Sequence, residues 1–198
     1  VKGASKGEGL GNKFLSHIRE VDAIINMVRC FEDGDITHVE GNIDPIRDLE
    51  LISLELIISD LESLEKRLPA LEKKLKTKPD KQIKRQVEII KEIITILANE
   101  KPASDFKSDE DDDVIIIKNL QLITSKPQLY VCNLSEDEVD AGNEFSDKVF
   151  AKGKVDEVGC LKISAKIESD IANLETEAEK EELLECMGLK ESGLSQIV

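Results

Sequence analysis

Four glycines lie within the first eleven residues of the chain, at Gly3, Gly7, Gly9 and Gly11. Glycine at this density is typical of backbone that bends tightly or approaches a ligand closely. The spacing completes no phosphate-binding motif, because a Walker A loop requires G-x-x-x-x-G-K-[ST] and a G-x-G-x-x-G reading from Gly7 places Asn12 at the third glycine. From composition alone, a flexible leader is the simpler explanation of these glycines.

The side chains that usually bind metals are too widely separated to predict a metal site. The chain has four cysteines, Cys30, Cys132, Cys160 and Cys186. They form no C-x-x-C pair, and His17 and His38 are not at metal-ligand spacing. Residues 33–44 lack the glycine at the sixth position of an EF-hand loop, which argues against calcium. We therefore expect free thiols, no metal site within this sequence and a cytoplasmic location.

The chain is strongly acidic, with a formal net charge of -15 over 198 residues. This charge argues against a surface that coats nucleic acid generally, although it leaves room for a local basic patch. Aromatic residues make up only 3% of the sequence, so the core must consist mainly of Ile, Leu and Val. No apolar run approaches the roughly 18 residues that a membrane span needs, and no secretory signal opens the sequence. We expect no membrane partner.

Two apolar stripes at heptad spacing predict a pair of long helices in the middle of the chain. The first stripe consists of Leu54, Ile57, Leu61, Leu64, Leu68, Leu71 and Leu75. The second consists of Ile83, Val87, Ile90, Ile94 and Leu97. Residues 76–80, KTKPD, predict a turn between them, so the helices should form an antiparallel coiled-coil hairpin. Pro69 predicts a kink in the first helix because it removes a backbone hydrogen bond.

Three short apolar runs on either side of this hairpin predict buried β-strands, at residues 23–28, 128–133 and 159–164. Residues 142–152 predict a helix between the last two strands. Buried strands that alternate with helices are typical of an α/β sheet, so the fold class predicted is α/β.

The expected domains are an α/β core made of residues 1–45 and 127–198, interrupted by a helical insertion at 46–126. Within the insertion, the acidic run SDEDDD at 108–113 is expected to be either a solvated loop or the charged start of a helix, where carboxylates are favourable.

Four blocks of sequence, in the same order along nearly the whole chain, resemble the YchF family, the Obg-related branch of the P-loop NTPases. They are VKGASKGEGLGNKFLSHIREVDAI (1–24), VRCFEDGDITHVEGNIDPIRDLELI (28–52), KPQLYVCNLSEDE (126–138) and ISAKIESDIANL (163–174). The paired helices also resemble the coiled-coil domain of that family. The resemblance implies that the predicted sheet is the C-terminal part of a G-domain. Asn26 departs from the family, where His is expected in this strand, and we expect little functional consequence.

The resemblance implies that the glycine-rich start is the switch II segment, which follows the D-x-x-G motif and responds to the terminal phosphate. In the family, the Walker A loop, switch I and D-x-x-G all precede this point, and a TGS-type domain follows the point where this sequence stops. We therefore expect an internal part of a longer NTPase. Mg²⁺ with ATP or GTP would bind the longer protein, whereas this part alone should hold neither and hydrolyse nothing.

By the same resemblance, residues 133–136 stand where a typical GTPase has N-K-x-D. Glu136 is longer than the Asp that accepts two hydrogen bonds from guanine, and Leu134 replaces the Lys that packs over the base. An Asn amide can satisfy both the donor and the acceptor of adenine. We expect Asn133 to recognise adenine, and the N-x-x-E pattern of the family implies a preference for ATP over GTP. Taken alone, Asn133 fits the cap of a strand-to-helix turn equally well.

The resemblance adds two further candidates. Ser164, Ala165 and Lys166 match the S-A-K motif, whose backbone N–H groups close over the base. His38 is the catalytic candidate, because a near-neutral pKa suits water positioning or proton transfer. A loop histidine without a function is the alternative, and His17 is a weaker candidate.

The function implied is a ribosome-associated NTPase that acts as a switch in translation or stress regulation, with ATP or GTP and the ribosome (large subunit or 70S) as partners. Cationic residues that would suit ribosomal RNA are Lys2, Lys6, Lys66, Arg67, Lys73, Lys74, Lys76, Lys84 and Arg85. A solvated helix flank explains most of them. The competing hypothesis is a non-catalytic helical-hairpin scaffold that contacts a partner protein through its coiled coil.

Overall fold

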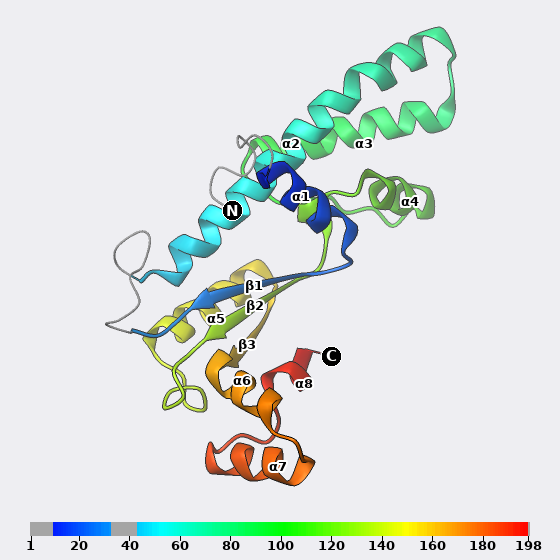
Figure 1. Ribbon diagram of the computed structural model, residues 1–198. Helices are drawn as coiled ribbons and strands as arrows, with labels where there is room; N and C mark the ends of the chain where they lie inside the picture. Colours follow the sequence, from blue (N-terminus) through cyan, green and yellow to red (C-terminus); the bar gives the residue numbers. More distant parts are fainter. Residues whose placement is uncertain (1–9, 33–42, 198) are drawn as a thin grey trace. The chain divides into compact units, whose positions relative to one another are not determined.

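The computed structural model describes residues 10–32 and 43–197 (Figure 1). The chain divides into two compact units. The helical unit consists of Val1–Ile24 with Glu50–Pro127, and the sheet unit consists of Ile25–Leu49 with Gln128–Val198. Among the described helices, none has both the length and the apolar character needed to cross a membrane.

The sheet has three strands in the order β1 (Ile24–Arg29), β2 (Gln128–Asn133) and β3 (Gly159–Ile163). Strands β2 and β3 are parallel, in a register that runs from Leu129 opposite Gly159 to Asn133 opposite Ile163. The three strands begin and end within one residue of the predicted runs, and the α/β fold class is confirmed. The prediction that every strand is buried was wrong for β1, where Ile25 and Met27 are half exposed on one face.

Among the described residues, the helices that lie wholly in the sheet unit are α5 (Glu144–Asp156), α6 (Ala165–Asn173), α7 (Glu177–Cys186) and α8 (Gly193–Ile197). Helix α5 begins later than predicted because Gly142 has a φ of +83°, which stops a helix, and Asn143 then caps the next turn. The core of the unit is formed by Val28, Cys30, Leu49, Tyr130, Cys132, Leu134, Val139, Val149 and Ile167.

The helical unit contains α1 (Leu10–Glu20), most of α2 (Pro45–Thr77), α3 (Lys81–Ala98) and α4 (Asp111–Leu120), with 3₁₀ turns η1 (Ala103–Asp105) and η2 (Ile123–Ser125). Helix α2 is continuous through Pro69. Helix α3 begins where the Asp80 side chain accepts hydrogen bonds from the backbone N–H groups of Gln82 and Ile83, at 2.8 and 3.0 Å.

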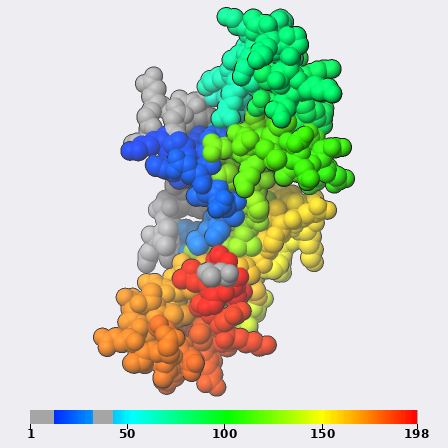
Figure 2. All heavy atoms as spheres, turned by 90° about the vertical axis from the view of Figure 1, so that its right-hand side faces the viewer, coloured from blue at the N-terminus to red at the C-terminus, as the bar shows by residue number. Residues whose placement is uncertain are grey.

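The buried face of α3 is wider than the heptad stripe predicted. Ile89 and Ile93 are fully buried although neither belongs to that stripe, whereas Leu54 in the first stripe is 38% exposed. The cause is that η1 and α4 also pack against α3, so this helix needs apolar residues toward more than one neighbour (Figure 2). A seam for a single partner helix would not require this width.

A buried ionic network fastens α1 to α2 and η2. The Asp60 carboxylate is fully buried and accepts hydrogen bonds from Arg19 Nη1 at 2.7 Å, Ile123 N at 3.0 Å and Thr124 N at 2.8 Å. Arg19 Nη2 also donates to the backbone oxygen of Ser59 at 3.1 Å. This network joins α1 to the helical residues with which it is grouped.

The acidic run begins α4, which was one of the two predicted outcomes, but Asp113 is not solvated. Its side chain is 2% exposed and accepts hydrogen bonds from Arg85 Nε at 2.9 Å, Arg85 Nη2 at 2.6 Å and Ser108 Oγ at 2.7 Å. The hydrogen bonds from Arg85 hold the pKa of the Asp113 carboxyl below its usual value. Arg67 is also used internally, because its Nη1 donates to the backbone oxygen of Leu120 at 2.8 Å.

Candidate functional site

Several predicted site residues lie outside the part of the chain that the structure describes. These are the switch II residues Gly3, Gly7 and Gly9 and the catalytic candidate His38. Gly11 lies in the first turn of α1. The catalytic and switch predictions therefore stay predictions, and the geometry concerns the residues predicted to recognise the base.

The two base-recognition motifs meet at one edge of the sheet. Asn133 ends β2, and residues 164–166 follow the end of β3, which is its parallel neighbour. The Leu134 N–H donates to the backbone oxygen of Ile163 at 2.8 Å, which continues the ladder beyond β2. Carboxyl ends of parallel strands are where ligands usually bind in open α/β sheets.

A direct hydrogen bond joins these motifs. The Ala165 N–H, at the first turn of α6, donates to Asn133 Oδ1 at 2.9 Å. Asn133 thus caps a helix, but it caps the one that follows β3, not one that follows its own strand. Among the described residues, Asn133 Nδ2 has no hydrogen-bond partner, so both amide protons remain available for donation.

Glu136 and Lys166 form a second link between the motifs. Lys166 Nζ donates to Glu136 Oε2, with 69% of the Lys166 side chain and 29% of the Glu136 side chain exposed. The hydrogen bond and charge of Glu136 raise the pKa of Lys166. Because the pair is partly open to water, it contributes little to the stability of the fold.

Two of the predicted base-recognition residues have buried side chains. Leu134 and Ser164 are each 2% exposed, and Leu134 belongs to the core of the sheet unit. These residues therefore support the site through backbone position, whereas Asn133, Glu136 and Lys166 carry the polar side chains that face outward.

Sequence reasoning missed the residues that hold the loop after Asn133 in place. Glu138 Oε2 accepts hydrogen bonds from Ser135 Oγ at 2.8 Å and from Asn143 Nδ2 at 3.0 Å. Asn143 Nδ2 also donates to the backbone oxygen of Cys30 at 2.6 Å. Asn143 followed by Ser146 was a readable capping signal, but nothing in the sequence indicated that Cys30 would be its partner.

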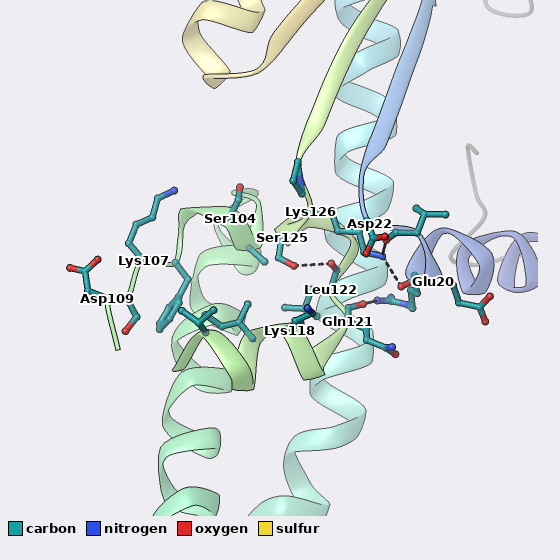
Figure 3. A pocket seen from close by; sticks show the side chains of 18 residues that line it. Glu20, Asp22, Ser104, Lys107, Asp109, Lys118, Gln121, Leu122, Ser125 and Lys126 are labelled. Atoms are coloured by element: carbon teal, nitrogen blue, oxygen red, sulfur yellow. Dashed lines mark hydrogen bonds between the residues drawn. The ribbon is translucent and has the colours of Figure 1, made fainter. Parts of the chain in front are cut away.

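One cavity belongs to the helical unit and contains none of the predicted nucleotide-contacting residues. It has a volume of about 610 Å³ and lies between the end of α1 and the segment from η1 to η2 (Figure 3). Lys126 Nζ, at its rim, donates to the backbone oxygens of Ile18 and Arg19 at 3.0 and 2.6 Å and to that of Val21. Burial lowers the pKa of Lys126.

This cavity has no arrangement that indicates catalysis. The amine of Lys126 is used to cap the C-terminal carbonyls of α1, which is a structural role. Across the described ranges, no group of three or more His, Cys, Asp or Glu side chains is placed to hold a metal ion. The candidate functional site is therefore the edge of the sheet at Asn133.

Comparisons with known proteins identify relatives along the whole sequence. No family model matches the chain. The "Ribosome-binding ATPase YchF" of Bacillus subtilis is 51% identical over 202 residues, which cover 100% of this chain and 54% of that protein. The protein of the same name from Haemophilus ducreyi is 41% identical over 198 residues, covering 100% of this chain and 53% of its own length.

A solved structure agrees with this similarity to YchF proteins. The Schizosaccharomyces pombe YchF GTPase matches with a TM-score of 0.80 at 38% identity, over 100% of this chain and 53% of that one. This chain spans about half the length of the curated relatives it matches. The similarity extends over every described element, including those that carry the base-recognition motifs. The sequence therefore belongs to the YchF family.

Proposed function

We propose that the protein containing this sequence is a P-loop nucleotide hydrolase that prefers ATP over GTP and acts as a ribosome-associated regulatory switch in the cytoplasm. The relatives support nucleotide hydrolysis and ribosome binding, because their names describe ribosome-binding ATPases and a GTPase. The preference for ATP rests on the residues at the edge of the sheet.

The observation that carries the proposal is the hydrogen bond from Ala165 N–H to Asn133 Oδ1. It fixes the orientation of the Asn133 amide, because Oδ1 faces α6 and Nδ2 must face the other way. Adenine presents an amino donor beside the ring acceptor N7. A carboxamide oxygen has two lone pairs, so Oδ1 can accept from the adenine amino group while it keeps Ala165, and Nδ2 can donate to N7.

Glu136 supports discrimination against guanine. In N-K-x-D proteins a carboxylate accepts two hydrogen bonds from guanine, whereas here the corresponding carboxylate is paired with Lys166. Guanine would have to compete with this cation for the carboxylate, and adenine would not.

We do not propose a binding site for Mg²⁺ or the phosphates among the described residues. The sequence contains no G-x-x-x-x-G-K-[ST] motif, and the described residues offer no cluster that fits Mg²⁺. When bound in a P-loop enzyme, Mg²⁺ neutralises charge that develops on the phosphates. We propose that a polypeptide of these 198 residues alone hydrolyses neither nucleotide.

We also propose that α2 and α3 form the helical-hairpin insertion of the family. Both helices contribute to one apolar core, and Lys91 Nζ on α3 lies 2.7 Å from Glu72 Oε1 on α2. The relatives' names favour a switch enzyme that carries this hairpin over a scaffold without catalysis.

The test is nucleotide binding by the full-length protein with Asn133→Asp and Asn133→Ala. Asn133→Asp keeps the shape and an acceptor for Ala165 but removes the Nδ2 donor, so ATP affinity should fall about tenfold or more, since about 1.4 kcal/mol corresponds to a factor of ten. Asn173→Asp is the matched control, because Asn173 bonds only within α6. ATP affinity that is unchanged in both Asn133 variants would remove Asn133 from base recognition.

A further inference from the structure

Positive charge is concentrated in one short segment of this acidic protein. Seven cationic side chains and one carboxylate, Asp80, lie between residues 73 and 86, whereas the whole chain has a net charge of -15. The cations are Lys73, Lys74, Lys76, Lys78, Lys81, Lys84 and Arg85. The segment comprises the end of α2, the turn and the start of α3, and we call its six lysines the basic tip (Figure 1).

The lysines of the basic tip are not used to hold the fold together. All six are exposed, and the ion pairs of the described residues include none for Lys73, Lys74, Lys78 or Lys81. By contrast, Arg85 is bound to Asp113 and Arg67 to the end of α4. Lys84 lies 3.8 Å from Glu88 of its own helix, in an exposed pair. The structure thus separates cations with an internal role from a cluster in which four of the six lysines have no ion pair among the described residues.

Helix stability does not explain this cluster. Lysines in the last turn of α2 are favourable for its dipole, but the first turn of α3 contains no acidic residue and has Lys81 at its start. Cations at a helix N-terminus are unfavourable, and only the Asp80 cap offsets them. The turn also brings these lysines close to those at the end of α2, so like charges repel. Unfavourable local arrangements of charge such as this one are typical of functional sites.

The chemistry of the tip favours a polyanion over a protein or a membrane. Protein interfaces depend on aromatic or apolar anchors, and helices on membrane surfaces insert apolar side chains. The exposed large apolar residues of the described chain all lie outside residues 73–86. Phosphate groups, in contrast, are bound by lysine charge alone.

We propose that the basic tip docks onto the phosphate backbone of RNA, and that it is the surface through which the protein contacts ribosomal RNA. This rests on the proposed ribosome association and adds the contact surface to it. The excess of negative charge elsewhere on the chain would repel RNA, so contact is confined to the tip. Thr77 lies 17 residues beyond the buried Asp60 on α2, which gives the tip a reach of roughly 25 Å from that anchor.

The experiment measures binding of the full-length protein to a 20-base-pair RNA duplex and to purified ribosomes over a series of salt concentrations. The tip variant carries Lys→Gln at positions 73, 74, 78 and 81. The matched control carries Lys→Gln at Lys101, Lys118, Lys154 and Lys190, which are exposed and change the net charge equally. A third variant carries Lys→Arg at the four tip positions. ATP affinity is measured on every preparation.

The tip variant should bind RNA at least about tenfold more weakly, and its salt slope should fall by about 3.6, because each of the four phosphate contacts removed contributes about 0.9. The control and the Lys→Arg variant should bind like the wild type. The proposal is overturned if the tip variant and the control weaken binding equally, if the wild type binds neither RNA probe, or if the wild type binds anionic vesicles or acidic peptides but not RNA. Failure of ATP binding with tip-dependent RNA binding intact would refute only the proposed enzyme function.

Discussion

Replacing Asp60 with Asn is the most informative single perturbation of the helical unit. The Asp60 carboxylate is 0% exposed and accepts hydrogen bonds from Arg19 Nη1, two backbone N–H groups and Thr124 Oγ1, all between 2.7 and 3.0 Å. Asn has nearly the same shape, so the change removes the charge and one acceptor without leaving a cavity. Its new Nδ2 group would face donors, which cannot bond to it.

The expected loss of unfolding free energy depends on the partners that Arg19 keeps after Asp60 is replaced. The Arg19 side chain is 17% exposed and would lose its only carboxylate among the described residues, although it keeps contacts to Ser59 and Gln121. Removing one partner of a buried ion pair costs about 3–5 kcal/mol. Because Arg19 keeps those neutral partners and some water contact, we expect the lower end, about 3 kcal/mol.

The assay is urea unfolding of the full-length protein together with amide hydrogen exchange. At a slope of about 2 kcal/mol per M, the unfolding midpoint of the helical unit should fall by about 1.5 M. The amides of Ile123 and Thr124 should exchange faster, since they lose the carboxylate that they contact. Glu62→Gln is the control on the same helix, because its pair with Lys66 is long at 3.9 Å and exposed, and should change stability by less than about 1 kcal/mol. A loss below about 1 kcal/mol for Asp60→Asn, with exchange unchanged, would refute the role of this network.

Two further changes test other parts of the structure. Gly153→Ala should destabilise the sheet unit by about 1–3 kcal/mol in thermal unfolding. The added Cβ would lie 2.2 Å from Cys160 Sγ and 2.9 Å from the backbone oxygen of Val158. A variant as stable as the wild type would show that α5 can move away from β3. Asp113 has a folded pKa below its usual value of 3.8, so it contributes stability above about pH 4 that is lost as the pH falls through the folded pKa. In urea unfolding between pH 7 and 3, the Asp113→Asn variant should therefore lose less unfolding free energy in acid than the wild type. Parallel plots of unfolding free energy against pH would contradict the pairing with Arg85.

Elements with a strong periodic pattern were predictable from the sequence. The apolar runs around residues 24–29 and 128–133 gave the strands to within one residue, and the repeat of Leu and Ile gave α2 and α3. The proximity of the two base-recognition motifs was also predictable, since parallel strands end at one edge of a sheet. The family resemblance supplied the roles predicted for them, because N-x-x-E and S-A-K are too short to be specific.

The buried charges were not predictable. Asp60 and Asp113 lie in segments rich in acidic residues, where most carboxylates face water, and their partners Arg19 and Arg85 are 41 and 28 residues away. No local periodicity reveals a pairing over that separation. The wide apolar face of α3 was missed for the same reason, because α3 packs against η1 and α4 as well as α2, and the positions of η1 and α4 depend on the tertiary fold.

The central claim is that the edge of the sheet at Asn133 recognises adenine. It is tested most directly by titrating the full-length wild-type protein with ATP, GTP and inosine triphosphate in the presence of Mg²⁺. Inosine keeps N7, replaces the amino donor at C6 with an oxygen acceptor and carries a proton on N1, so its comparison with ATP tests the contacts along this edge of the base, including the contact to Asn133 Oδ1. ATP binding at least about tenfold tighter than both of the others is the predicted result. Equal affinity for ATP and inosine triphosphate, or tighter binding of GTP, would contradict the account.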